Sequence, residues 1–287
     1  MKPTIINSSN NQTKDIPDRR EFFSRLTAMA GGAAALVLLR FPEKNNAGAQ
    51  IVASDDPRLH TEHITYPAET GDMRAYLARP KGEGKYPGVI VIHENKGLNA
   101  HIEDVTRRVA LEGFLAVAPD ALSPWGGTPE DVEKVRTLFR KIDYPQTVKN
   151  FVAAVKYLQT NPLSTGKVGC TGFCWGGAVT NQVVVNSPEL LAAVPYYGRQ
   201  PETADVPKIK ASLLLHYAGD DERINKGIAS FEKALQEAEI EYQIFMYEGA
   251  KHAFNNDTNP SRYNKEAAEL AWERTMAFFK EKLKSED

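Results

Sequence analysis

The stretch Val168-Gly-Cys-Thr-Gly-Phe-Cys-Trp-Gly-Gly177 decides how the rest of the chain is interpreted. Residues 167–171 form a short, mostly apolar run that predicts a strand, and residues 176–187 predict a helix. Glycines lie two positions before and two positions after Cys174. Side chains at those two positions would collide in a tight strand-to-helix turn, so the spacing predicts that Cys174 occupies the turn.

A cysteine in such a turn is suited to nucleophilic attack. The pattern is Gly-x-Ser-x-Gly with cysteine in place of serine, and the positive end of the following helix favours the thiolate. The alternative is a structural cysteine beside glycines that only pack. Cys170 lies inside the strand, where we expect a small core residue. Extended chain geometry holds it too far from Cys174 for a disulfide.

Strands and helices alternate along the remainder of the chain. Residues 63–68 and 74–79 predict a hairpin, because a Glu-Thr-Gly-Asp turn lies between two runs of strand character. Further strands are expected at 88–93, 115–118, 192–197, 211–217 and 242–247, and further helices at 101–112, 129–141, 145–160, 225–237 and 261–284. This order predicts an α/β fold with a mostly parallel sheet and helices on both faces. No Pro/Gly-rich linker follows residue 60, so we expect one domain.

The composition restricts the functions open to the chain. Its 287 residues carry a formal net charge of −2 and include two cysteines. Without a basic excess we expect no binding to nucleic acid. Two cysteines are too few for a Cys-rich zinc site, and His60 and His63 flank no suitable acidic cluster, so we expect no metal and no cofactor. A monomer or a small homo-oligomer is expected.

The first 49 residues predict an export signal. The pair Arg19-Arg20 precedes two phenylalanines and the apolar run 26–39, and Ala47-Gly-Ala49 has the small-x-small form of a cleavage site. The arginine pair resembles the twin-arginine signal. The apolar run is shorter than the ~20 residues that span a bilayer, although a membrane anchor or a basic amphipathic helix stays open as an alternative. We expect residues 50–287 to form the mature domain, to be periplasmic and to have no stable membrane association.

Two histidines follow Cys174 in the sequence. His216 lies within a predicted strand and is expected to be a packed core residue. His252 lies in the loop after strand 242–247, and loops at the carboxyl ends of strands place catalytic groups in this kind of sheet. His252 is therefore the expected base. The acid that orients its ring is expected among the three adjacent carboxylates Asp220-Asp-Glu222.

An anionic intermediate requires hydrogen-bond donors. The backbone N–H of Trp175, directly after the nucleophile, is one candidate, and the N–H of Asn95, in the loop after strand 88–93, is the other. Glu94 ends that apolar strand, and a buried carboxylate needs a partner. Two interpretations stay open: Glu94 pairs with a surface lysine, or it faces the thiol and controls its protonation.

Taken together, these motifs resemble the dienelactone hydrolase family of α/β-hydrolases. The resemblance covers residues 60–285 and rests on Gly-Phe-Cys174-Trp-Gly-Gly, Glu94 after GVIVIH, Ala-Pro-Asp120, Gly-Asp-Asp221-x-x-Ile224 and Gly-Ala-Lys-His252-Ala-Phe. It implies the α/β-hydrolase fold and a catalytic triad of Cys174, Asp221 and His252. In that family the acid lies three positions before an aliphatic residue, so the resemblance favours Asp221, which precedes Ile224 by three, over Asp220. The resemblance also implies that Glu94 pairs with the resting thiol and releases it when substrate binds.

The resemblance implies cysteine-dependent hydrolysis of small-molecule carboxylic esters or lactones through an acyl-enzyme, without a cofactor. Family members that open dienelactones hold the substrate carboxylate with arginines, one of them four residues after the catalytic histidine. This chain has Asn256 at that position, and Arg136 and Arg140 resemble ordinary helix charges. The alternatives are a thiol-dependent acyltransferase or peptidase on the same fold, and a non-catalytic binding protein.

Overall fold

The computed structural model describes residues 5–7 and 50–284, which include a nine-stranded sheet of order β1-β9-β8-β7-β6-β4-β5-β3-β2. From β5 to β9 all neighbouring strands are parallel, and the pairs β2–β3, β3–β5 and β1–β9 are antiparallel. The strands are β1 (Ile5–Asn7), β2 (Leu59–Ala68), β3 (Gly71–Pro80), β4 (Tyr86–Ile92), β5 (Leu115–Pro119), β6 (Ser164–Phe173), β7 (Ala192–Tyr196), β8 (Ser212–Asp220) and β9 (Tyr242–Lys251). The predicted α/β class and the amino-terminal hairpin are confirmed.

The predicted export signal lies outside the described residues, apart from Ile5–Asn7. Those three residues form the edge strand β1 beside β9, where the sequence pattern predicted no strand. None of the described helices is long and apolar enough to cross a bilayer.

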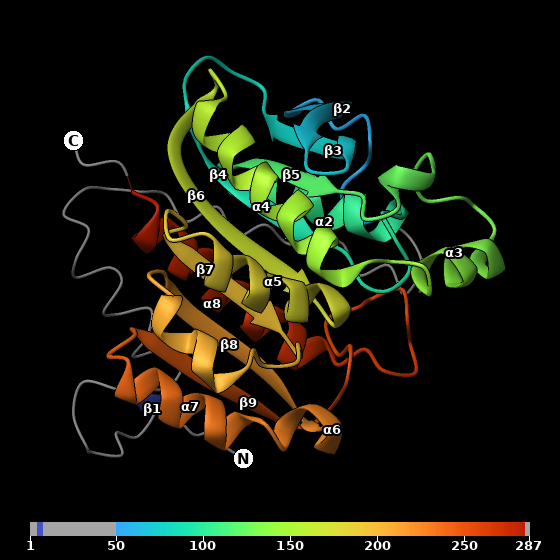
Figure 1. The fold of residues 1–287 in the computed structure, drawn as a ribbon. Coiled ribbons are helices and arrows are strands. Elements are labelled where there is room, and N and C mark those ends of the chain that lie inside the picture. Colours follow the sequence, from blue (N-terminus) through green and yellow to red (C-terminus); the bar gives the residue numbers. More distant parts are fainter. Residues whose placement is uncertain (1–4, 8–49, 285–287) are drawn as a thin grey trace.

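Helices cover both faces of the sheet (Figure 1). Side chains of α4, α5 and α7 pack into one hydrophobic cluster, and side chains of α2 and α8 pack into the other. The helices are α2 (Ala100–Leu111), α3 (Val132–Phe139), α4 (Tyr144–Thr160), α5 (Trp175–Asn186), α6 (Glu222–Asn225), α7 (Ile228–Glu237) and α8 (Lys265–Lys282), with 3-10 turns η1 (Ser123–Trp125) and η2 (Thr203–Lys208). The predicted sheet with helices on both faces is therefore confirmed.

Strand β4 shows why a continuous apolar run suits the centre of this sheet. Ile90 and Ile92 belong to the cluster under α4 and α5, whereas Val89 and Val91 belong to the cluster under α2. Successive side chains of a strand point to opposite faces, so a strand covered on both sides needs apolar residues at every position. Polar residues appear only where β4 ends, at His93 and Glu94.

The last helix begins later than its predicted start at residue 261. Asn264 has extended backbone angles, and its side chain accepts a hydrogen bond from the N–H of Ala267, so it is the N-cap of α8. Residues 252–264 consequently form a loop, which leaves Arg262 on that loop. The predicted helix 225–237 likewise begins later, as α7 at Ile228, and the short α6 precedes it.

Residues 51 and 52 are anchored on α2. The backbone N–H groups of Ile51 and Val52 donate to the buried Asp104 carboxylate at 3.1 and 2.7 Å. The buried Arg107 donates from Nε to the Val52 carbonyl at 2.8 Å and from Nη1 to the Tyr76 hydroxyl at 2.9 Å. These contacts give both charged groups hydrogen-bond partners in the interior, where an unpaired charge would be costly.

Candidate active site

The turn between β6 and α5 holds Cys174 in the geometry that its glycines predict. Its backbone angles are φ 58° and ψ −112°, which L-residues rarely adopt. A Cβ on Gly172 would lie 2.3 Å from the Gly176 carbonyl oxygen. A Cβ on Gly176 would lie 2.4 Å from the carbonyl oxygens of Ile92 and His93. Only glycine fits at either position, and the close approach brings the start of α5 against the end of β4.

The Cys174 thiol is half-buried and is neutral at neutral pH. Burial is the main reason that its pKa rises to about 11, and the negative charge of Glu94 raises it further. The Trp175 N–H and the Arg223 guanidinium act in the opposite direction. Among the described residues, no side chain forms a hydrogen bond with the sulfur.

His252 and Asp221 meet through a hydrogen bond between Nδ1 and Oδ2. His252 follows the end of β9, and the buried Asp221 follows the end of β8, so adjacent parallel strands deliver the two side chains to the same edge. The Tyr197 ring packs edge-on against the His252 ring, with 5.1 Å between the centroids. These two contacts fix the plane of the imidazole. They leave its Nε2 available to accept or donate a proton.

Glu94 is buried, and its partner is Asn256 rather than a surface lysine. Asn256 Nδ2 donates to Glu94 Oε2 at 2.7 Å, although 162 positions separate the two residues. The amide is itself oriented, because Asn256 Oδ1 accepts from the backbone N–H of Thr258 at 3.0 Å. Asn256 lies four residues after His252 and holds the carboxylate by a neutral contact.

A cavity of about 410 Å³ brings five of the predicted residues together, and its lining includes Glu94, Asn95, Cys174, Asp221 and His252. The sixth, Trp175, presents its backbone N–H to the sulfur. Within the described ranges, no group of three His, Cys, Asp or Glu residues is placed to hold a metal ion.

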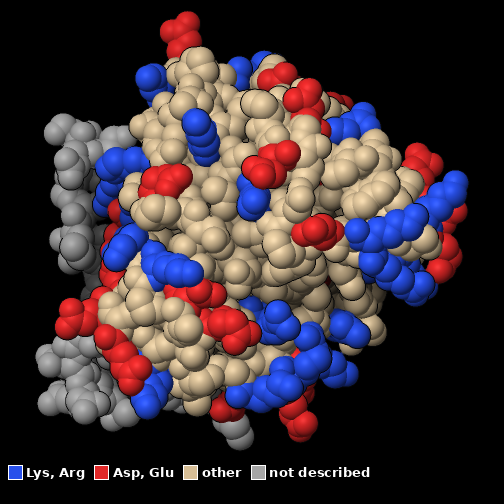
Figure 2. Space-filling view, viewed as in Figure 1, with Lys and Arg blue, Asp and Glu red and all other residues tan. Residues whose placement is uncertain are grey.

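Three cationic side chains also line this cavity: Lys96, Arg223 and Arg262. All three residues are exposed, and none forms an ion pair with a carboxylate in the described part of the chain. Figure 2 shows Lys and Arg side chains gathered on the side of the molecule where α6 lies. The cavity carboxylates already have partners in His252 and Asn256. The cavity is therefore suited to a ligand with negative charge.

The residues that the sequence excluded from the site lie elsewhere. Cys170 is fully buried in β6, and both cysteines are free, so its prediction as a core residue is confirmed. His216 is fully buried as well, between the Tyr247 hydroxyl at 2.9 Å and the Thr275 hydroxyl at 3.1 Å. Arg136 pairs with Glu133 on the surface of α3.

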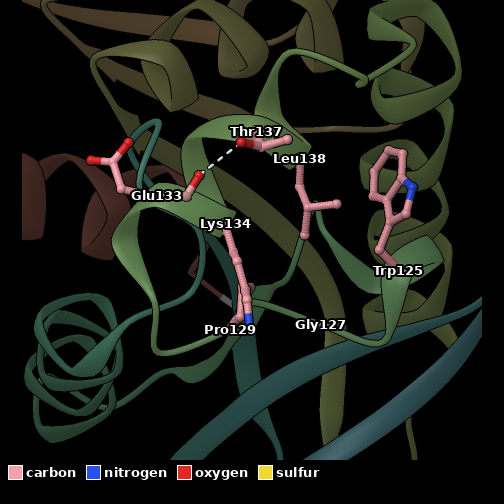
Figure 3. A pocket seen from close by; sticks show the side chains of 7 residues that line it. All are labelled: Trp125, Gly127, Pro129, Glu133, Lys134, Thr137 and Leu138. Carbon is pink, nitrogen blue, oxygen red and sulfur yellow. Dashed lines mark hydrogen bonds between the residues drawn. The ribbon is translucent and has the colours of Figure 1, made fainter.

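A second hollow of about 420 Å³ lies between η1 and α3. Figure 3 shows Trp125, Lys134 and Leu138 among the side chains that line it, and the Thr137 hydroxyl donating to the Glu133 carbonyl. Its lining contains no cysteine or histidine, and its polar atoms are not arranged around a common point. It offers no chemistry comparable to that of the cavity at Cys174.

The parallel sheet, the strained cysteine between strand and helix, and the helices on both faces define an α/β-hydrolase fold. An acylaminoacyl peptidase structure from Pyrococcus horikoshii shares this fold at a TM-score of 0.61 and 14% identity, covering 80% of this chain and 43% of that one. A putative dienelactone hydrolase structure from Klebsiella pneumoniae aligns at a TM-score of 0.69 and 30% identity, covering 77% of this chain and 98% of that one.

The chain belongs to the dienelactone hydrolase family, whose sequence profile matches residues 73–283. A putative carboxymethylenebutenolidase of Escherichia coli is 33% identical over 256 residues, which cover 84% of this chain and 94% of the relative. One of Synechocystis is 35% identical over 244 residues, with coverages of 79% and 98%. The protein is a hydrolase that acts on lactones or esters.

Proposed function

We propose that the protein hydrolyses carboxylic esters or lactones with Cys174 as nucleophile, His252 as general base and Asp221 as the acid that orients the base. The observation that carries this proposal is the hydrogen bond between His252 and the buried Asp221, in the cavity that also holds the strained Cys174. A nucleophile, a base and an orienting carboxylate are what acyl transfer through a covalent intermediate requires.

The reaction begins when His252 Nε2 takes the proton from the Cys174 thiol. The sulfur attacks the carbonyl carbon, a C–S bond forms, and the electron pair of the C=O bond moves to its oxygen. The N–H groups of Trp175 and Asn95 hold that oxyanion. When the intermediate collapses, the C–O bond of the ester breaks and the leaving alkoxide takes the proton from His252. Water then gives a proton to His252 and its oxygen attacks the thioester carbon. The C–S bond breaks, the carboxylic acid leaves, and the sulfur takes the proton back from His252.

Glu94 adds to the burial that keeps the thiol neutral before substrate arrives. Its negative charge beside Cys174 disfavours a second negative charge on the sulfur and so raises the thiol pKa. Asn256 stabilises the carboxylate without neutralising it. A substrate that enters between the Glu94 carboxylate and the Cys174 thiol separates these two groups. Proton transfer from the thiol to His252 then becomes easier.

Substitution of the two cysteines tests the proposal. We expect Cys174→Ala to lower ester hydrolysis about 10⁴-fold or more, and Cys170→Ala, the matched control, to keep most of it. Hydrolysis that persists in Cys174→Ala would refute the nucleophile assignment. Product analysis with an added alcohol separates a hydrolase from an acyltransferase, because an acyltransferase gives mainly the new ester. Cleavage of peptide substrates in preference to esters would instead identify a peptidase.

We also propose that residues 1–49 direct the protein to the periplasm by the twin-arginine route and are then removed. This proposal is supported by the sequence order of Arg19-Arg20, the apolar run 26–39 and Ala47-Gly-Ala49. The twin-arginine route carries folded proteins, which would allow Cys170 to be buried before it reaches an oxidising compartment.

A further inference from the structure

His93, at the end of β4, is fully buried and is hydrogen-bonded through both ring nitrogens. The backbone N–H of Ala121 lies 3.1 Å from Nε2, and the Glu94 carbonyl oxygen lies 2.6 Å from Nδ1. A backbone N–H only donates, so Nε2 must accept and carries no proton. The proton therefore lies on Nδ1, which donates to the Glu94 carbonyl. Burial lowers the pKa of His93, which keeps the ring neutral as this arrangement requires.

The Glu94 carbonyl belongs to the peptide group that contains the Asn95 N–H. The peptide bonds of the described residues are trans, and in a trans peptide the C=O and the N–H point in opposite directions. Since His93 holds the carbonyl on one side, the Asn95 N–H points to the other side. Asn95 lines the cavity with Cys174, and no acceptor for its N–H exists among residues 50–284. The Asn95 N–H is therefore held in one orientation and donates to none of the described residues.

The same ring also contacts the residue that supplies the other oxyanion donor. The His93 imidazole lies nearly parallel to the Trp175 indole, with 5.4 Å between centroids and 13° between planes. Phe139 and Phe151 pack edge-on against the indole. The His93 carbonyl oxygen also lies against Gly176, which follows Trp175. The buried His93 side chain therefore contacts both segments that supply the proposed donors: the Glu94–Asn95 peptide and Trp175.

We propose that His93 is a positioning residue of the oxyanion hole: its Nδ1–H fixes the plane of the Glu94–Asn95 peptide so that the Asn95 and Trp175 N–H groups converge on the substrate oxygen. This inference rests on the proposed function. The role differs from that of the triad, because His93 does not touch the sulfur or the base. Loss of its N–H lowers the rate of acyl transfer without changing the reactivity of the thiol towards an alkylating agent.

Two substitutions separate this role from packing. His93→Phe keeps an aromatic ring beside Trp175 but removes the N–H. His93→Asn loses the ring but places an amide N–H near the position of Nδ1. If His93 only fills space, the phenylalanine variant is the milder change. If it orients the peptide, the asparagine variant keeps more activity. His216→Phe, which changes another fully buried histidine, is the matched control.

The measurements are kcat and KM for ester hydrolysis and the rate of Cys174 alkylation by iodoacetamide. We expect His93→Phe to lower kcat about 10- to 100-fold, somewhat less than the loss of a whole oxyanion donor. KM and the alkylation rate should stay within about twofold, because the Asn95 N–H that His93 orients acts on the oxyanion that forms during the reaction, and the Trp175 N–H that acts on the sulfur is not the group that His93 holds. His93→Asn should recover at least part of kcat, and His216→Phe should keep it.

The outcomes that overturn the inference are distinct from those that overturn the proposed function. Wild-type kcat in His93→Phe, or a lower kcat in His93→Asn than in His93→Phe, overturns the role of His93 while Cys174-dependent hydrolysis stands. Alkylation that falls in parallel with kcat also overturns it, because the substitution then acts on the thiol. Ester hydrolysis that does not depend on Cys174 overturns the proposed function, and the inference with it.

Discussion

Replacing Glu94 with glutamine tests how the resting thiol is kept neutral. The substitution removes one negative charge from the cavity at almost constant shape, and the amide can still interact with Asn256. Without the carboxylate, an anionic sulfur is less disfavoured, so the pKa of Cys174 falls. We expect Glu94→Gln to alkylate faster at mildly alkaline pH and to hydrolyse esters more slowly, because the substrate-triggered release is lost.

The size of the effect follows from the causes of the raised pKa. A pKa of about 11 compares with an ordinary value of 9.0 for a cysteine thiol. At about pH 8 the first leaves roughly one thiol in 1000 ionised and the second roughly one in ten. Burial is the largest cause, and Glu94 comes second. Removal of Glu94 should thus recover part of this range, and we expect roughly tenfold faster alkylation.

The assay is the rate of iodoacetamide labelling at Cys174 between about pH 7 and pH 11, measured in wild type and variant. Below the thiol pKa the rate rises with pH as the thiolate fraction rises. The curve of Glu94→Gln should therefore shift to lower pH. Glu248→Gln removes an exposed carboxylate outside the cavity and should not shift the curve. An unchanged labelling curve together with unchanged turnover would leave Glu94 a structural carboxylate only.

The cationic side chains of the cavity, the turn at Cys174 and residues 1–49 each give a further test. Arg262→Gln should raise KM several-fold for an ester that carries a carboxylate and leave KM of a neutral ester unchanged; equal effects on both would exclude a charge contact. Gly176→Ala should destabilise the fold by about 2–4 kcal/mol in urea unfolding, because its Cβ would lie 2.4 Å from backbone oxygens. Gly82→Ala, with its nearest contact at 3.4 Å, should be nearly neutral, and a similar loss in both would refute the steric argument. Replacing Arg19 and Arg20 with lysines should retain the precursor in the cytoplasm, whereas normally exported protein should begin near residue 50 on amino-terminal sequencing.

The fold could be predicted from the sequence because its main signals are local. The run in β4, the hairpin and the glycines around Cys174 each specify their own geometry over a few residues. The sequence also placed His252 and Asp221 directly after predicted strands of a mostly parallel sheet, whose carboxyl ends lie at one edge. The structure places them in hydrogen-bond contact.

Contacts between distant loops could not be predicted in the same way. Nothing near Asn256 indicates that it meets Glu94, because that contact depends on how the loop 252–264 folds back over the end of β4. Arg262 was assigned to a helix, and the N-cap at Asn264 was the signal that could have corrected this. His93 offered a weaker signal: an imidazole at the end of a buried apolar strand must find partners for both ring nitrogens.

The anchor of residues 51 and 52 on α2 sets a limit for shortening the chain. A peptidase that cleaves after Ala49 leaves the contacts of Ile51 and Val52 with Asp104 and Arg107 intact. Cleavage that also removes residues 50–52 deprives the buried Asp104 and Arg107 side chains of their backbone partners. The cost is about 1–3 kcal/mol for each unsatisfied group. Residue 50 is exposed and precedes the anchor. A purification tag or a surface linker joined there should leave α2, and the site that depends on its sheet, undisturbed.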